Sequence, residues 1–388
     1  MATWSITPGV FIDERRTPQG TLARAACGVA AFLDDFGGGP VNQPTLISSF
    51  SDFDRIFGGL RPSSDGGYAV RQYFDNGGHH AVVVGLGSPG PASASSLDAG
   101  FHALAGIPPG SFDLLCVPGM ARLDAAAYTQ VARSVTAVAR DQRAFALLDP
   151  PAHAGPGSTP RTFLTRTWPQ LSGLSPDAAL WFPAVTTTDP HDPTGRRTLG
   201  ASGAIAGLIA RTDRERGPWQ SPAGNTATLV DAQPVRALRS ADVGALAPRG
   251  VNALRGSAGG QVVSWGARTL SGDDGLRSEW KYVPVRRTAL MIEASIANGL
   301  QWVVFEPNAE PLWSRVRFEV DELLRGLWND GALEGSRADE AWFVRCGLGT
   351  TMTSADLVDG RLVVELGFAP LRPAEFLILR VTRRAQPA

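Results

Sequence analysis

The stretch FDLLCVPGMARLDAAAYTQVARSVTAVARDQRAFALLDPP, residues 112–151, decides the fold class of this chain. Its two apolar ends, residues 112–119 and 144–151, each have the length of a buried strand, and residues 124–140 between them have the composition of a helix. Two strands joined by a helix form a βαβ unit, whose strands lie parallel in one sheet. The stretch therefore predicts an α/β (α+β) fold with a partly parallel sheet.

The same alternation continues on both sides of this stretch. Strands are expected at residues 28–36, 44–50, 80–87 and 178–185. Helices are expected at residues 50–59, 66–78 and 200–213, and residues 160–171 are expected to be partly helical. In the first of these helices, Ser51 or Asp52 is the predicted N-cap and Gly58 lies near the end.

A second structured region begins near residue 263. Pro284 fits the first turn of a helix. The apolar residues of that helix recur at helical spacing: Val285, Ala289, Ile292 and Ile296. A longer helix, capped by Asn308 and ended by Gly331, is predicted from residues that step three and four positions: Trp313, Val316, Val320, Leu323 and Leu327. Buried strands are expected at residues 301–307, 341–347, 361–370 and 374–384.

The composition excludes several classes of function. The 388 residues hold 36 Lys+Arg against 37 Asp+Glu, and this net charge of -1 gives no support to nucleic-acid binding. The three cysteines, Cys27, Cys116 and Cys346, lack the spacing of a disulfide framework or a zinc site. No apolar run approaches the ~20 residues that span a bilayer, and the first residues lack the pattern of a signal peptide. We therefore expect cytoplasmic assembly without direct membrane insertion.

The loop GLGSPG, Gly85–Gly90, formally fits the G-x-G-x-x-G pattern of a dinucleotide site. Such a site needs a helix that opens on the last glycines, so that its N-terminus faces the phosphates. Pro89 and Pro91 interrupt that turn, and we interpret the loop as a linker. An α/β enzyme that binds a nucleotide at Gly85–Gly90 is the alternative function.

Other polar clusters are better explained by structure than by chemistry. His79 and His80 have no carboxylate or cysteine at metal-binding spacing, which favours a surface turn. Ser202 lacks the second glycine of a nucleophile elbow, so we expect an N-cap and close helix packing there. Asp273 and Asp274 lie between glycines in a predicted turn. We predict no catalytic residue, no cofactor and no metal, and a structural protein in place of an enzyme.

Apolar, strand-like segments lie at both ends of the chain. They are formed by Val10, Phe11 and Ile12 near the N-terminus and by Phe376, Leu377, Ile378 and Leu379 near the C-terminus. Neither segment has an evident partner strand beside it in the sequence. An extended segment of this kind can add to the sheet edge of another chain, with alternate side chains entering its core. We therefore predict that both segments are assembly arms.

Seven phrases spread along the chain are together more specific than any single motif. They are TPGVFIDE (7–14), YFDNGG (73–78), ARTDRERGPWQSPAG (210–224), WGARTL (265–270), YVPVRRT (282–288), QWVVFEPN (301–308) and PAEFLILRV (373–381). By their number and order, the chain resembles the sheath proteins of contractile tails: bacteriophage tail sheaths, R-type bacteriocins and extracellular contractile injection systems. Residues 91–200 match less distinctly.

The resemblance implies a division of the chain into domains. An N-terminal donor arm (1–22) precedes a core sheath domain, which is built from two parts (23–90 and 263–372). An outer α/β domain (91–262) is inserted between these parts, and a C-terminal arm (373–388) ends the chain.

The resemblance also implies the function of a structural subunit. It would polymerise as stacked hexameric rings in a helical sheath around an inner tube, with baseplate and terminator proteins as further partners. Contraction would drive the tube through a target envelope, and the phage tail or tail-like particle can be released outside the cell. Five charged residues are candidates for contacts between subunits: Arg286, Arg287, Glu293, Glu306 and Arg315.

Overall fold

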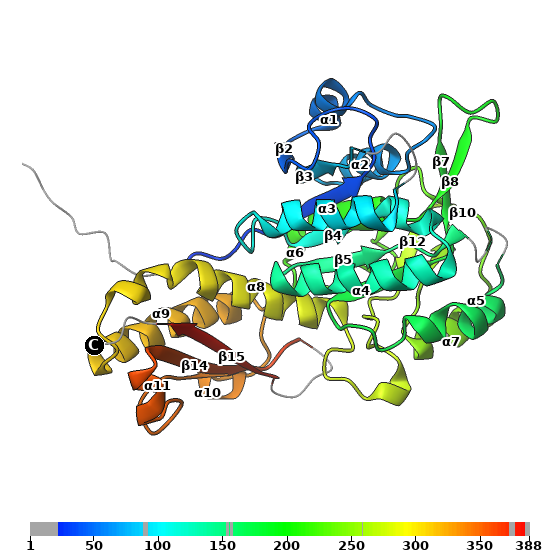
Figure 1. Ribbon diagram of the computed structural model, residues 1–388. Helices are drawn as coiled ribbons and strands as arrows, with labels where there is room; N and C mark the ends of the chain where they lie inside the picture. The colour runs from blue at the N-terminus through cyan, green and yellow to red at the C-terminus, as the bar shows by residue number, and fades with distance from the viewer. Residues whose placement is uncertain are drawn as a thin grey trace, which may run out of the picture.

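The computed structural model describes residues 22–87, 92–152, 155, 158–257, 259–371 and 377–384. Residues 28–282 form a large α/β unit, and the chain from residue 283 onward forms a smaller C-terminal unit at the lower left of Figure 1. The long helix α8 (Val283–Gly299) runs from beneath the α/β unit into the C-terminal unit.

One nine-stranded sheet forms the centre of the α/β unit, in the order β2-β3-β1-β4-β5-β6-β11-β12-β9. Its strands are β1 (Val29–Asp34), β2 (Thr45–Ile47), β3 (His80–Gly85), β4 (Leu114–Cys116), β5 (Phe145–Leu148), β6 (Ala178–Phe182), β9 (Thr228–Leu229), β11 (Asn252–Gly256) and β12 (Val262–Trp265). From β3 to β11 in this order every neighbouring pair is parallel, whereas β2, β12 and β9 pair antiparallel. The predicted α/β fold with a partly parallel sheet is confirmed.

Helices cover both faces of this sheet, so its central strands are apolar along their whole length. On one face lie α2 (Gly66–Asp75) and α6 (Ser202–Arg216), and on the other lie α3 (Ala94–Ala105) and α4 (Ala125–Asp141). Adjacent residues of β1 enter different cores: Phe32 packs with α2 and α6, and Leu33 packs with α3 and α4. This alternation is the two-residue period of a strand buried on both sides.

Two glycines let α6 approach α2 closely. A Cβ atom at Gly203 would lie 2.2 Å from the carbonyl oxygen of Ala69, and one at Gly207 would lie 2.3 Å from that of Tyr73. Neither backbone oxygen can move without displacing α2. The close helix packing expected from the small residues around Ser202 is therefore confirmed.

Smaller elements complete the α/β unit. They are α1 (Phe50–Phe57), η1 (Pro118–Arg122), α5 (Pro160–Arg166), η3 (Trp168–Gln170), α7 (Ser240–Leu246), η4 (Ala247–Arg249), η5 (Asp274–Leu276) and the sheet β10-β7-β8, made of β7 (Val185–Thr188), β8 (Arg196–Leu199) and β10 (Gln233–Pro234). Strands β7 and β8 form a hairpin that projects from the unit (Figure 1).

The C-terminal unit packs two helices against a small sheet. Helix α9 (Glu310–Asn329) buries the predicted stripe, including Val316, Val320 and Leu327, against the antiparallel sheet β13-β14-β15. Its strands are β13 (Trp342–Arg345), β14 (Arg361–Phe368) and β15 (Leu377–Arg384), and the short helices α10 (Ala338–Ala341) and α11 (Ser354–Val358) lie between them in sequence. Three of the four predicted C-terminal strands are confirmed.

The fourth predicted strand, residues 301–307, is wrong. Residues Gln301–Phe305 form the 3-10 helix η6, and Phe305 is 79% exposed. A short apolar run does not by itself distinguish a strand from a helical turn. By length and composition, the stretch Val283–Phe305 is also apolar enough to cross a membrane, contrary to the expectation that no apolar run approaches this length. Of its most apolar 18 residues, 61% are buried inside the protein, as in the core helix of a globular domain.

Three predicted helix caps are wrong by one to three positions. The N-caps of α1, α6 and α9 are Ser49, Ala201 and Ala309, in place of Ser51 or Asp52, Ser202 and Asn308. Asn308 instead accepts a hydrogen bond from the Trp313 indole and donates one to the Arg361 carbonyl. A cap is decided by which residue leaves helical geometry, and several neighbouring polar residues offer the same side chain.

The predicted domain boundary at residue 90 does not coincide with a break in the sheet. Strand β1, from the first segment, pairs with β3 on one side and with β4, from the second segment, on the other. Of the N-terminal donor arm, only Leu22 lies within the described residues.

Candidate functional site

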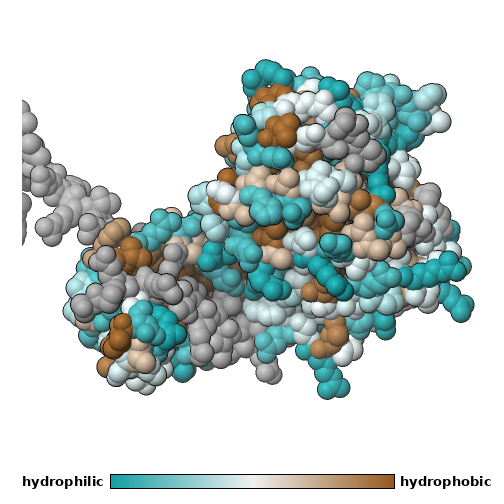
Figure 2. Space-filling view, in the orientation of Figure 1, coloured by the Kyte–Doolittle hydropathy of each residue, from teal (hydrophilic) through white to brown (hydrophobic). Residues whose placement is uncertain are grey.

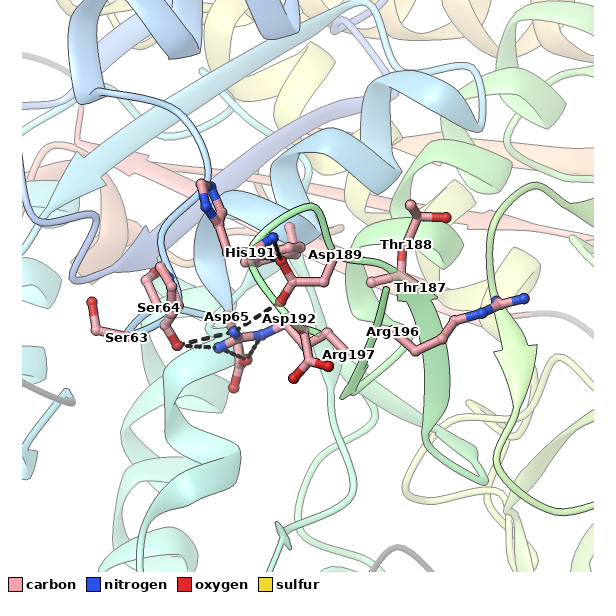
Figure 3. A network of polar contacts seen from close by, with 12 residues as sticks. Ser63, Ser64, Asp65, Thr187, Thr188, Asp189, His191, Asp192, Arg196 and Arg197 are labelled. Carbon is pink, nitrogen blue, oxygen red and sulfur yellow. Dashed lines mark hydrogen bonds and ion pairs between the residues drawn. The ribbon is translucent and has the colours of Figure 1, made fainter. Parts of the chain in front are cut away.

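Two arginines, Arg122 and Arg197, hold Asp65 at the carboxyl end of the parallel strands, and Figure 3 shows Arg197 beside it. Arg122 donates to both of its oxygens, at 2.6 and 2.7 Å, and Arg197 of β8 donates to one of them at 2.8 Å. Arg197 also donates to the Pro62 carbonyl at 2.9 Å. Asp65 is thus fully paired by the two arginines, and Arg197 attaches the β7–β8 hairpin to the loop before α2.

The loop end of the same hairpin is held by a second carboxylate, Asp189, which directly follows β7. Asp189 accepts a 2.6 Å hydrogen bond from the Tyr68 hydroxyl and one from the His191 amide at 2.8 Å. Its other oxygen lies 3.6 Å from Arg197, whose guanidinium stacks 4.5 Å from the centre of the Tyr68 ring. Each group here is satisfied by a neighbour in the same chain, so the network is a structural fastening.

Two buried carboxylates lie beneath this network. Burial, and then the charge of Asp65, raise the pKa of Asp34 to about 7. Burial raises the pKa of Asp149 to about 6, although Ser202 donates to it through its amide at 2.8 Å and its hydroxyl at 2.6 Å. Ser202 therefore serves as a donor to Asp149. A hydroxyl bound to a carboxylate with no histidine between them is not a nucleophile–base pair.

The Gly85–Gly90 loop lacks the geometry of a nucleotide site in its described part. Helix α3 begins only at Ala94, capped by Ser93, and so does not open on the last glycines of the loop. A Cβ atom at Gly87 would lie 2.6 Å from Val41, which packs against this position. Residues 88–91 lie outside the described residues.

The turn predicted at Asp273 and Asp274 is confirmed, whereas the surface turn predicted at His79 and His80 is wrong in part, because β3 already begins at His80. His80 is an exposed residue at the start of β3, and its ring bonds to the Ser48 hydroxyl at 3.2 Å. Asp273 caps the single turn η5, and Asp274 forms ion pairs with Arg268 and Lys281.

One group of potential metal ligands is found among the described residues: Cys27, Asp113 and Asp213. Arg287 donates to both aspartates, each at 2.6 Å. Burial, followed by the two aspartates, raises the pKa of the Cys27 thiol well above its usual range, so the thiol keeps its proton. The guanidinium already forms ion pairs with both carboxylates, and we interpret the cluster as an ion-pair site.

Of the five charged residues predicted to contact other subunits, four have partners within the chain and the fifth, Glu306, is an exposed residue. Arg286 and Glu293 pair with each other at 3.2 Å, and Arg287 is buried with the two aspartates, so all three have partners within the chain. Arg315 donates to the buried Glu319 at 2.9 Å and stacks 3.7 Å from the Trp302 ring. Glu306 is exposed. In the single chain the side chains of Arg286 and Arg287 are only 11% and 3% exposed, which leaves little of either for a contact with another subunit.

The predicted C-terminal arm begins outside the described residues and continues into β15. Phe376 lies outside them, as do Val10, Phe11 and Ile12 of the N-terminal arm. Leu377, Ile378 and Leu379 are opposite Phe368, Gly367 and Leu366 of β14 in the same chain. Within the described residues, β13 and β15 are the two outer strands of this sheet.

Large apolar side chains are exposed on the C-terminal unit, where Figure 2 shows brown, hydrophobic surface. They are Phe305 (79% exposed), Phe318 (61%), Leu348 (48%) and Val358 (78%). Four other large apolar side chains, Val41, Leu46, Val230 and Leu276, are 49–65% exposed on the α/β unit. Exposed apolar groups mark a surface for another protein only where they form one patch. The sequence contained a clue to Phe318, because it stands among charged residues outside the apolar stripe of α9.

Comparison with known proteins identifies this architecture. Residues 90–270 match the phage tail sheath protein central domain, and residues 277–384 match the phage tail sheath C-terminal domain. The chain belongs to the phage tail sheath family. It is 27% identical over 340 residues to a putative prophage major tail sheath protein of Pseudomonas aeruginosa, a match that covers 81% of each. It is 31% identical over 139 residues to the tail sheath protein of Vibrio phage KVP40, and this match spans 20% of that protein.

Solved sheath structures resemble this sheath protein along nearly its whole length. The anti-feeding prophage helical sheath in the contracted state is 32% identical, with a TM-score of 0.73, and the match covers 98% of this chain and 100% of the other. The PVC sheath complex of an extracellular contractile injection system, also contracted, is 27% identical, with a TM-score of 0.72 over 98% and 99% of the two chains. The protein is therefore a structural subunit of a contractile sheath and not an enzyme, and the nucleotide alternative finds no support.

Proposed function

We propose that this sheath subunit polymerises as stacked hexameric rings around an inner tube, joined to a baseplate at one end and to terminator proteins. The observation that carries the proposal is the 98% coverage of this chain by a helical sheath captured in its contracted state. The sheath would assemble in the cytoplasm and become part of a phage tail or tail-like particle. Contraction would drive the tube through a target envelope.

The proposed contacts between subunits use the C-terminal sheet. The N-terminal arm, with Val10, Phe11 and Ile12, would add to an edge of that sheet in a neighbouring copy. The C-terminal strand, which in the single chain pairs with β14, would pair with β14 of another copy. The exchange of the C-terminal strand would keep the antiparallel hydrogen bonds with β14 and replace only the chain that supplies them, whereas the N-terminal arm would add new main-chain hydrogen bonds at a sheet edge.

One arm by itself binds marginally. Each hydrogen bond contributes about 1 kcal/mol and each large buried apolar side chain roughly 1.5–3 kcal/mol. Ordering each arm residue costs about 1–2 kcal/mol of backbone entropy. Stable assembly would therefore need both arms of many subunits acting together.

Electron microscopy of purified protein tests this function, with striated tubes or rings expected. Deleting residues 1–16 should abolish long tubes and leave the folded chain intact, because the described residues from Leu22 onward form dense apolar cores with one another. Circular dichroism of the truncated chain checks that it remains folded. Long tubes formed by a folded, truncated chain would contradict arm donation, and a full-length chain that never forms tubes or rings would contradict the sheath role.

A further inference from the structure

Helix α8 lies against the amino ends of the parallel strands through two consecutive arginines. Arg287 donates to Asp113, the residue directly before β4, and to Asp213 of α6, each at 2.6 Å. Its side chain is 3% exposed and that of Asp213 is 3% exposed. This ion pair therefore joins α8 to the sheet and to a helix of the α/β unit inside the protein.

Arg286 makes a second attachment two strands away. It donates to Asp177, the residue directly before β6, whose side chain is 1% exposed. Its guanidinium also reaches Glu293 at 3.2 Å and stacks 4.6 Å from the Trp280 ring. Because β5 separates β4 from β6, the two attachments lie about 10 Å apart along the sheet edge.

The segment that leads toward the N-terminal arm is attached to the same helix and its unit. The Ala25 amide donates to the buried Ser295 hydroxyl of α8 at 2.8 Å. Leu22 packs in the C-terminal core, against Gly299, and Arg24 pairs with Asp330 after α9 at 2.6 Å. The chain then enters β1 of the large sheet at Val29, whose amide donates to Asp113.

We propose that α8, with Arg286, Arg287 and Ser295, is the element that couples the base of the N-terminal arm and the C-terminal unit to the α/β unit. A displacement applied at residue 22 acts on α8 through Leu22 and Ala25, beside the direct path along the chain into β1. It passes to the sheet through the two arginines, because separating the units would leave buried carboxylates without their partners. The importance of this coupling for contraction rests on the proposed function, whereas the coupling itself is a property of the single chain.

Hydrogen exchange of the full, unassembled chain tests the coupling. In the wild type, the slowest amides of α9 and β14 should open together with those of β4 and β6, in one cooperative unit. Arg287→Lys keeps the charge but loses the planar fork that serves two carboxylates. We expect opening of α9 and β14 in this variant to rise at least tenfold relative to β4 and β6.

Arg325→Lys is the matched control, because Arg325 is 47% exposed on α9, pairs with Asp321 and Glu322 of its own helix and lies over the Trp342 ring, all within the C-terminal unit. In Arg325→Lys, the slowest amides of α9 and β14 should still open together with those of β4 and β6. If Arg287→Lys does not fold, Arg286→Lys is subjected to the same comparison. Independent opening of the two units in the wild type, or unchanged relative opening in both folded arginine variants, overturns the proposal. Microscopy of assembled tubes decides the sheath function separately.

Discussion

Replacing Phe318 by serine separates folding of the sheath subunit from its assembly. The side chain projects from α9 and is 61% exposed in the single chain. Its removal should therefore leave the core of the C-terminal unit, formed by residues such as Val316 and Val320, almost unchanged. If the exposed side of α9 that carries Phe318 contacts a neighbouring subunit, the loss of the side chain affects polymerisation and leaves folding unchanged.

The size of the effect follows from the exposed area. A phenylalanine buries about 150–250 Å² when fully covered. The share still exposed corresponds to roughly 90–150 Å², or about 3 kcal/mol at ~25 cal/mol per Å². Since each ~1.4 kcal/mol is a factor of ten, the concentration at which Phe318→Ser chains polymerise should rise roughly 100-fold.

Sedimentation of tubes across a concentration series measures this change. Thermal unfolding of the unassembled variant should stay close to that of the wild type. Leu46→Ser is the matched control, because Leu46 is 65% exposed on β2 of the α/β unit, away from the C-terminal unit. Polymerisation of folded Phe318→Ser chains at the wild-type concentration would refute the assignment of this face to an interface.

Three further variants test the interior of the α/β unit. Protonated Asp34 contributes stability that is fully present below its unfolded pKa of about 3.8 and is lost as pH rises through its folded pKa of about 7. Asparagine does not titrate, so the free energy of unfolding of Asp34→Asn, measured in urea relative to the wild type, should be higher at pH 8 than at pH 5. An unchanged difference between the two pH values would contradict the burial of this carboxyl. Gly203→Val should lower stability by at least about 1–3 kcal/mol in thermal unfolding, since α6 cannot approach α2, whereas Gly244→Ala, in open space on α7, should not. Ser202→Ala should cost roughly 1.5–3 kcal/mol above pH 7, because it removes a donor from ionised Asp149, and less near pH 5; equal losses at both pH values would count against this role.

Much of the fold could be predicted because the evidence for it is local. The strand, helix and strand of residues 112–151 became β4, α4 and β5 in one parallel sheet. The stripe of α9 and the strands β13, β14 and β15 also follow from periods of 3.6 and two residues. Residues 301–307 failed because a short apolar run carries no period long enough to decide between a strand and a helical turn.

The sequence by itself determined the fold class, the family and most of the order of secondary structure, since each depends on patterns that neighbouring residues carry. It did not determine the division into two units, because the sequence predicted residues 23–90 and 263–372 as one domain whereas β1 and β3 pair in one sheet with β4. Only the tertiary structure decided what the charged residues do. Arg287 looked like a surface charge, yet it is buried against Asp113 and Asp213, which stand 174 and 74 positions away. Such partners meet because the parallel sheet brings the amino ends of its strands to one edge, where α8 crosses them. The residue pattern of α8 alone could not predict these partners, because the energy of a buried ion pair depends on the distance between the charges in space and not on their separation in the sequence.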